Sequence, residues 1–352
     1  MWRLVASRIL LIAVALGVAA VTVPVHAQQS GRIVAVGDLH GDYSAWRDIA
    51  RAAGIVSAKG RWIGGETTLV QTGDIADRGP KTLAIIRDIR RLEREARAAG
   101  GRVIVLVGNH EAMNVIGDLR YVTPEEFAAF ADRGSAGRRE SLYQRRRAEI
   151  EGAARATPAS SDLKPEDIKA AWLRETPLGW VEHRLAWSPS GYIGRWVASS
   201  PAVVQIGGTI FVHGGLSAEY AQLSLDHIND QVRTAIRAAD QSPTAIISDP
   251  LGPLWYRGLI SRSPTVVEPR VLAPGRPAID AELDAVLRVH GAKRLVVGHT
   301  PNSAGIVVSH GGRLIRIDSG NSAYYGGQLS YLEIAGDRVV PHVVRRSRPR
   351  RS

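Results

Sequence analysis

The sequence of 352 residues contains no cysteine. This absence excludes a disulfide scaffold, a thiolate zinc site, an iron–sulfur cluster and a cysteine nucleophile. Any bound metal ion must therefore be held by histidine, carboxylate or asparagine side chains. The sequence also has no internal repeat and no recognisable nucleic-acid-binding motif, so its basic charge predicts no specific nucleic-acid partner.

Basic residues outnumber acidic ones by 45 to 34, which gives a formal net charge of +11 and favours anionic partners such as phosphates. Arg3 and Arg8 lie in the first 27 residues, and five arginines lie in the last eight. The chain between these ends carries only +4. We expect residues 345–352 to form a solvated basic tail.

The first 27 residues have the features of a signal peptide. Arg3 and Arg8 precede an uninterrupted apolar run at 9–21, and small residues end the segment at Ala27. The run is shorter than the roughly 20 residues of a spanning helix, which favours cleavage over retention as an anchor. We expect a secreted protein, in a bacterial periplasm, with no membrane contact after cleavage.

Apolar segments ending in glycine and polar residues alternate with helical patterns after residue 30. This layout predicts an α/β fold whose functional residues lie at the carboxyl ends of its strands. The predicted strands are 31–36, 68–71, 102–107, 203–206, 209–212 and 294–297, with several short strands in 305–343. The predicted helices are 43–53, 82–98, 225–239 and 279–289.

The pattern changes between residues 112 and 196, where polar helices are predicted at 124–130, 138–155 and 165–174 and a loop at 157–162. Because the strands resume afterwards, we interpret this region as a helical cap inserted into one catalytic domain at 28–344.

Five short motifs follow the predicted strands, and each alone could be a structural turn. Their ordered recurrence at strand ends argues against coincidence. Carboxylate, imidazole and amide groups are the ligands that a pair of divalent cations requires, with one carboxylate bridging the two. The motifs are Gly37-Asp38-Leu39-His40-Gly41, Gly73-Asp74-Ile75-Ala76-Asp77-Arg78-Gly79, Gly108-Asn109-His110-Glu111, His213-Gly214-Gly215 and Gly298-His299-Thr300.

These motifs resemble the metallophosphoesterase superfamily, and specifically its phosphoprotein phosphatase (PPP) family. The segments 109–122, 211–217 and 253–258 are similar to the bacterial Shewanella-like protein phosphatase branch. The resemblance spans about residues 32–321. It implies the calcineurin-like fold, with two central mixed β-sheets flanked by helices and an inserted helical cap.

The resemblance also implies roles for individual residues. A hydroxide bridging two divalent metals (Mn, Fe or Zn) would attack phosphorus in line. His110 would protonate the leaving oxygen and Asp77 would orient His110, while Arg78, together with Asn109, would bind the phosphate. The implied metal ligands are Asp38 and His40 for the first ion, Asp74 as the bridge, and Asn109, His213 and His299 for the second.

Some further residues have two possible roles, and others have one. Arg257 contacts either the phosphate or a surface carboxylate. Asp118 and Arg120 either line the substrate pocket or serve in helix capping and cap packing. Glu111 is expected to buttress its loop, and Asp318 to support the site from behind. The remaining histidines that match no motif are expected to be structural; these are His183, His227, His290 and His310.

Three functions were weighed. The first is a phosphatase acting on phosphorylated proteins or peptides, with aryl phosphates in range because the branch includes members that prefer phosphotyrosine. The alternative is a small-molecule phosphoesterase such as a dinucleoside polyphosphate hydrolase; those relatives lack an acid equivalent to Asp77. The third, a non-catalytic phosphate- or metal-binding protein, is disfavoured because no expected ligand is missing. The sequence makes no prediction of oligomeric state.

Overall fold

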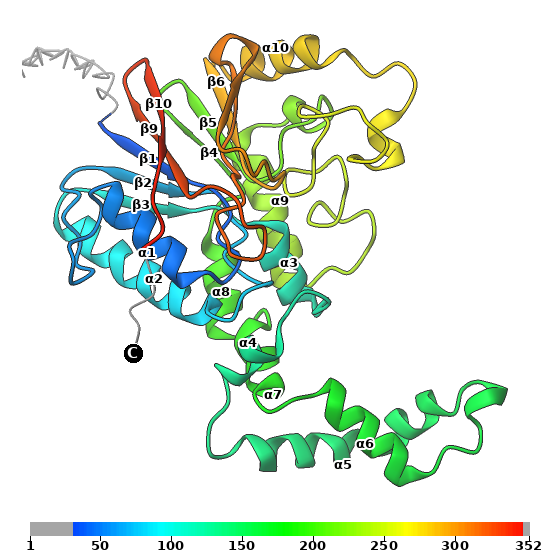
Figure 1. Ribbon diagram of the computed structural model, residues 1–352. Helices are drawn as coiled ribbons and strands as arrows, with labels where there is room; N and C mark the ends of the chain where they lie inside the picture. The colour runs from blue at the N-terminus through cyan, green and yellow to red at the C-terminus, as the bar shows by residue number, and fades with distance from the viewer. Residues whose placement is uncertain (1–30, 348–352) are drawn as a thin grey trace, which may run out of the picture.

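Two five-stranded mixed sheets form the centre of the computed structural model, which describes residues 31–347 (Figure 1). The first sheet has the order β10-β9-β1-β2-β3, and the second has the order β4-β5-β6-β8-β7. The first contains β1 (Ile33–Val36), β2 (Thr68–Gln71), β3 (Arg102–Val105), β9 (Ser330–Ala335) and β10 (Arg338–Val343). The second contains β4 (Val203–Ile206), β5 (Thr209–Val212), β6 (Arg294–Val297), β7 (Val307–Ser309) and β8 (Leu314–Arg316).

Alternate residues of a strand point to opposite faces, and β1 uses both. Ile33 and Ala35 pack in a core shared with Phe211 of the second sheet, so the two sheets pack face to face. Val34 and Val36 belong to the larger core beneath the helices. Burial on both faces explains why the central strands are continuously apolar.

Parallel pairing aligns the carboxyl ends of the strands that precede the sequence motifs. In the first sheet β1 pairs parallel with β2, and β2 with β3. In the second, β5 pairs parallel with β6, and β6 with β8. On its other side β1 pairs antiparallel with β9, which comes from a distant part of the chain. This arrangement places all five motifs at one edge of the sandwich.

Amphipathic helices cover the outer faces of the sheets. On the first sheet, α1 (Tyr43–Ala52) buries Trp46, whose Nε1 donates to Asp88 Oδ2 of α2 (Thr82–Ala98) at 2.9 Å. The second sheet is accompanied by α9 (Leu225–Ala238) and α10 (Ile279–Val289). Single 3₁₀ turns occur at Pro158–Ser160, Tyr220–Gln222, Pro269–Leu272 and His310–Gly312.

Six helices lie between β3 and β4, as the inserted cap predicts. They are α3 (Asn109–Ile116), α4 (Pro124–Ala128), α5 (Ser135–Ala154), α6 (Pro165–Glu175), α7 (Trp180–Trp187) and α8 (Tyr192–Ser199). The sequence did not predict α3, α7 or α8. Figure 1 shows that only α5 and α6 project from the body, and we call residues 132–179 the arm.

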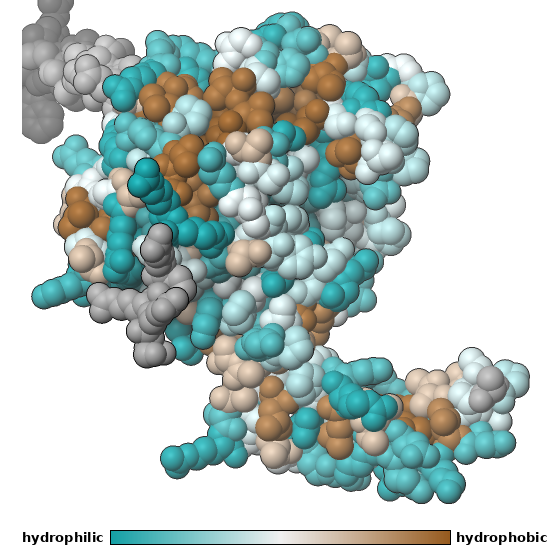
Figure 2. Space-filling model, in the orientation of Figure 1, coloured by the Kyte–Doolittle hydropathy of each residue, from teal (hydrophilic) through white to brown (hydrophobic). Residues whose placement is uncertain are grey.

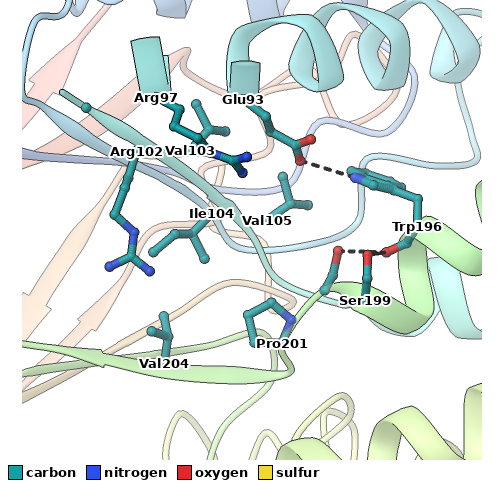
Figure 3. A pocket seen from close by; sticks show the side chains of 12 residues that line it. Glu93, Arg97, Arg102, Val103, Ile104, Val105, Trp196, Ser199, Pro201 and Val204 are labelled. Carbon is teal, nitrogen blue, oxygen red and sulfur yellow. Dashed lines mark hydrogen bonds between the residues drawn. The ribbon is translucent and has the colours of Figure 1, made fainter. Parts of the chain in front are cut away.

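The last helix of the insertion belongs to the body of the protein. Trp196 of α8 is buried in the main core, and its Nε1 donates to Glu93 Oε1 of α2 at 3.2 Å (Figure 3). Ser199 Oγ donates to the carbonyl oxygen of Trp196 at 2.7 Å. The cap is therefore smaller than the predicted 112–196, because both ends of that segment pack against the sheets.

The structure describes part of the predicted tail but none of the predicted signal peptide. The predicted signal peptide at 1–27 lies outside the described residues. The described part of the basic tail, residues 345–347, is exposed and contacts the region of α1: Arg346 Nη1 donates to Asp42 Oδ2 at 2.9 Å, and Ser347 N donates to Asp48 Oδ2 at 2.7 Å. Between residues 31 and 347 no helix is both long and apolar enough to span a bilayer.

Candidate metal centre and catalytic groups

The five motifs meet at the shared edge of the two sheets, and their side chains are buried there. Seven non-glycine residues in the described chain have positive φ, and five of them lie in these motifs. Such backbone costs of order 1–3 kcal/mol per residue and is concentrated at functional sites. The five are His40 (φ 42°), Asp74 (φ 53°), Asp77 (φ 71°), Arg78 (φ 64°) and His299 (φ 65°).

The turn after β3 requires glycine because the chain passes very close to Asp74. A Cβ on Gly108 would lie 2.2 Å from Asp74 Oδ1. The same close approach lets the backbone N–H of His110 donate to Asp74 Oδ1 at 3.0 Å. The glycine therefore brings the loops after β2 and β3 into direct contact.

Asp74 lies at the centre of the cluster. Its Oδ2 is 3.3 Å from His213 Nε2, 3.8 Å from His110 Nε2 and 3.9 Å from His40 Nε2. Burial by itself raises the pKa of Asp74, but the surrounding imidazoles of His213, His110 and His40 hold it well below the ordinary value. The carboxylate is therefore kept ionised, as a bridging ligand must be.

Hydrogen bonds on the far side of two rings fix which nitrogen faces this centre. His40 Nδ1 donates to the carbonyl oxygen of Ala76 at 3.0 Å, and His213 Nδ1 donates to that of Thr72 at 2.8 Å. In both rings Nδ1 thus carries a proton and Nε2 points towards Asp74, the orientation typical of metal-binding histidines. Burial lowers the pKa of His40 to about 3, so that ring is neutral and available as a ligand.

The second half of the cluster contains an unsatisfied nitrogen. His299 Nε2 is buried and has no hydrogen-bond partner among residues 31–347. His299 N donates to Asp38 Oδ2 at 3.1 Å, and Asn109 Oδ1 lies 2.9 Å from His213 Nε2. A buried, unpaired imidazole nitrogen is costly unless a ligand occupies it. This donor set of nitrogen and oxygen atoms fits a divalent transition metal.

Two groups of potential ligands share one carboxylate. The first consists of His40, Asp74 and His110, and the second of Asp74, His213 and His299. Asp38 lies beside the first group, with Oδ2 4.0 Å from His40 Nε2. The structure thus brings together every metal ligand that the sequence predicted, with Asp74 in the shared position.

His110 differs from the other histidines because a carboxylate holds its outer nitrogen. Its Nδ1 donates to Asp77 Oδ2 at 2.5 Å, and Asp77 Oδ1 accepts from Asn114 Nδ2 at 2.8 Å. Burial lowers the pKa of His110, but the charges of Asp74 and Asp77 outweigh burial and raise it. The ring is therefore biased towards the protonated form. The sequence motifs predicted no role for Asn114, although it lies one helical turn from His110.

Arg78 lies on the open side of His110, within a group of aromatic rings. Its Nη2 is 3.5 Å from His110 Nε2. Its guanidinium lies 4.6 Å from the ring centre of Tyr121, 5.0 Å from that of Tyr324 and 5.2 Å from that of Tyr325. Cation–π contacts orient the guanidinium without consuming its N–H donors. These three tyrosines, the tyrosine collar, were not recognised in the sequence.

The supporting residues are placed as follows. Glu111 accepts backbone N–H groups from both loops, including Asp74 N at 2.8 Å and Gly108 N at 2.9 Å, so it buttresses them as expected. Asp318 is buried behind Asp38, and burial raises its pKa to about 6. Arg257 is partly buried and makes no ion pair with a carboxylate of residues 31–347; burial holds its pKa below the ordinary value, against the opposing charge of Asp74.

The remaining candidates make their contacts outside the two ligand groups. Arg120 Nε donates to Asp118 Oδ1 at 2.8 Å in an exposed pair, so these side chains bind each other. His183 is completely buried against Phe127, Phe130 and Trp187. Of the histidines expected to be structural, none belongs to the two ligand groups; they are His183, His227, His290 and His310.

Comparison with known proteins agrees with this geometry. The family described as calcineurin-like phosphoesterase matches residues 31–303. The chain is 34% identical over 324 residues to Shewanella-like protein phosphatase 2 of Arabidopsis thaliana, across 88% of this chain and 76% of that protein. It is 26% identical to Shewanella-like protein phosphatase 1 of Plasmodium berghei, across 88% and 73%.

A solved structure has the same fold over most of the chain. The cold-active protein-tyrosine phosphatase of a psychrophilic Shewanella species superimposes with a TM-score of 0.63 and 26% identity, covering 90% of this chain and 80% of that one. The family acts with divalent metal ions on phosphoric monoesters. On these matches and on the ligand groups around Asp74, the chain belongs to the calcineurin-like metallophosphoesterases and, within their PPP family, to the Shewanella-like protein phosphatases.

Proposed function

We propose that the protein is an exported phosphatase that uses two metal ions to hydrolyse phosphomonoesters on proteins or peptides. The observation that carries this proposal is the shared position of Asp74 between two ligand groups, one of which contains the unsatisfied His299 Nε2. Two divalent ions (Mn, Fe or Zn) held there would supply an activated water and neutralise the phosphoryl oxygens.

The ligands of the two positions come from the loops that follow different strands. Asp38 and His40 follow β1 and would hold the first ion, and Asp74 after β2 would bridge. The second ion would be held by residues after β3, β5 and β6, namely Asn109, His213 and His299. The neutral His40 and the ionised Asp74 are in the protonation states that this role requires.

His110 would donate a proton to the leaving oxygen. Its Nε2 faces the centre, while Asp77 holds Nδ1 and stabilises the imidazolium. Asn114 positions Asp77 by donating to its second oxygen. A positioned general acid of this kind contributes about 10²–10⁴-fold to the rate. Proton donation matters most for esters whose leaving group is a strongly basic oxygen, because that oxygen leaves poorly as an anion.

Two arginines would bind the phosphoryl group. Arg78 is oriented by the tyrosine collar beside His110, and Arg257 is partly buried within range of the charge of Asp74. A guanidinium can donate two parallel hydrogen bonds to phosphate oxygens. Arg78 Nε is buried and has no hydrogen-bond partner among residues 31–347, and a phosphate oxygen of the substrate would accept a hydrogen bond from it.

The tyrosine collar favours aryl phosphates within this class. Tyr121 and Tyr324 are exposed at 38% and 61%, and they flank the side of His110 where the leaving group must depart. Flat aromatic rings stack favourably with one another. The relative from Shewanella is a protein-tyrosine phosphatase, which supports phosphotyrosine as the preferred substrate.

One comparison of substrates tests the proposal against its alternatives. The purified protein with Mn²⁺ should hydrolyse para-nitrophenyl phosphate and a phosphotyrosine peptide faster than a phosphoserine peptide. Faster hydrolysis of diadenosine tetraphosphate would identify a small-molecule phosphoesterase. Metal binding without turnover of any of these substrates would identify a non-catalytic protein.

Export rests on the sequence of residues 1–27. We propose cleavage after Ala27 and release into the periplasm or medium. Expression of the full chain in a Gram-negative host should place the protein in the periplasmic fraction with Gln28 as its first residue. Recovery in the membrane fraction with an intact N-terminus would identify an anchor.

A further inference from the structure

A groove runs along the base of the arm, outside the metal centre. It lies between α5 and α7 and has a volume of about 610 Å³. In Figure 1 α5 runs along the arm and α7 lies where the arm meets the body, and in Figure 2 hydrophobic residues are visible on the surface of the arm. We call it the arm groove, and define it by the residues used below: Leu142, Arg145, Arg146, Trp180, Arg184 and Leu185.

The floor of the arm groove is apolar and incompletely buried. Leu142 of α5 and Trp180 of α7 are half-buried, and Leu185 remains 61% exposed. α5 itself buries only Ser135 and Tyr143 over twenty residues. A helix that leaves apolar side chains in an open groove gains stability when a partner covers them.

The rim of the groove is basic. Four arginines line it and no carboxylate does. Arg145 has no hydrogen-bond or ion-pair partner between residues 31 and 347. Arg146 pairs with Glu149, but both side chains are more than half exposed, and such a pair contributes only about 0–1 kcal/mol. These arginines can therefore exchange their present contacts for the carboxylates of a ligand.

The groove is connected to the catalytic groups through one of its own residues. Arg184 of α7 donates to the carbonyl oxygens of Asn114 and Val115, at the carboxyl end of α3. Asn114 holds Asp77, and α3 begins at the proposed ligand Asn109. Arg184 is therefore the contact through which the groove adjoins the helix that carries His110.

We propose that the arm groove docks a segment of the phosphoprotein substrate that combines acidic side chains with bulky apolar ones, separate from the phosphorylated residue. This inference rests on the proposed phosphoprotein phosphatase function. The apolar floor selects leucine or aromatic side chains, and the exposed Arg145 and Arg146 select carboxylates. The metal centre would then determine the chemistry, and the arm would determine which proteins are recognised.

The test compares two long phosphotyrosine peptides. One carries Asp-Asp-Leu-Glu-Glu-Leu-Phe, joined to the phosphotyrosine by a flexible Gly-Ser linker, and the other has lysine in place of every acid; each is made with the segment on either side. We expect the acidic peptide to have a kcat/KM about tenfold higher, which corresponds to about 1.4 kcal/mol. Because the rim is exposed, added salt should reduce this difference.

Two variants locate the effect. Leu185→Asp and Arg145→Glu should each remove most of the preference for the acidic peptide and leave para-nitrophenyl phosphate hydrolysis unchanged. Matched changes on α6 and its preceding loop, Arg174→Glu and Leu163→Asp, should leave both activities unchanged. Should Leu185→Asp lower the thermal stability, Leu185→Ala serves in its place.

Each other outcome contradicts the inference in a recognisable way. Equal turnover of both peptides by the wild type, with normal activity on para-nitrophenyl phosphate, would overturn the docking groove but leave the phosphatase function intact. No activity on any phosphomonoester would overturn the function itself. If the variants lose binding to phosphatidylserine vesicles, or change from dimer to monomer, and peptide preference persists, the occupant is a membrane or a second copy.

Discussion

The hydrogen bond between His110 and Asp77 allows a quantitative test of general-acid catalysis. Asp77 is completely buried, and its two oxygens accept from His110 Nδ1 and Asn114 Nδ2. The substitution Asp77→Asn keeps the size of the side chain but replaces one acceptor by a donor. The amide can then accept from only one of the two neighbours, and the negative charge beside the imidazolium is lost.

The expected loss follows from the strength of that bond. A hydrogen bond to a charged group contributes about 1.5–3 kcal/mol, and each 1.4 kcal/mol corresponds to a tenfold change in rate. We therefore expect kcat for phenyl phosphate to fall about 10–150-fold. For para-nitrophenyl phosphate, whose leaving group needs little protonation, the loss should be much smaller.

The assay is a series of substituted phenyl phosphates, with log kcat plotted against the pKa of the leaving phenol. The slope should be clearly more negative for Asp77→Asn than for the wild type, and metal content should be equal. Asp230→Asn, an exposed carboxylate on α9, is the matched control and should not alter the slope. An equal loss for every leaving group would refute the assignment of His110 as the acid, because Asp77 would then act on structure or metal binding alone.

Three further predictions concern other parts of the site. His299→Ala should reduce the bound metal from two ions to about one per chain by elemental analysis, because it removes the unsatisfied Nε2 from the second ligand group; two retained ions would contradict its role. Tyr121→Ala should raise KM for a phosphotyrosine peptide more than for a phosphoserine peptide, and equal changes would argue against stacking. Burial and the charge of Asp77 raise the pKa of Glu126 well above its ordinary value, so the unfolded chain ionises first and stability falls as pH rises above about 4.5. Glu126→Gln should therefore stabilise the protein more at pH 8 than at pH 5 in urea denaturation, and a pH-independent difference would show that Glu126 is ionised in the folded state.

Much of the first sheet and the ligand set could be predicted from the sequence because the signals are local. The strands at 33–36, 68–71 and 102–105 are each followed within three residues by a glycine, and ligand-type residues come directly after that glycine. Parallel pairing then brings the ligands together without further information. The helices α2 and α10 were also placed correctly, since each has a sustained apolar period.

The parts that sequence could not predict depend on distant contacts. The helix α8 contains Gly194 and lacks a long apolar period, yet Trp196 stabilises it by packing and bonding to α2. The tyrosine collar joins Tyr121 from the start of the cap to Tyr324 from the loop before β9. Neither tyrosine carries a local signal of its role, because Arg78, which brings them together, lies far away in sequence.

The pairing of β1 with β9 has a consequence for how the chain folds. The four-residue strand β1 lies between β2 and β9, so its second row of hydrogen bonds cannot form until residues 330–335 have been synthesised. Contacts of such large sequence separation carry a high loop-closure cost and make folding slow. Until they form, β1 exposes an unpaired apolar edge on which other chains can add. The nascent chain therefore has to keep this edge from pairing with other chains until residues 330–335 are available.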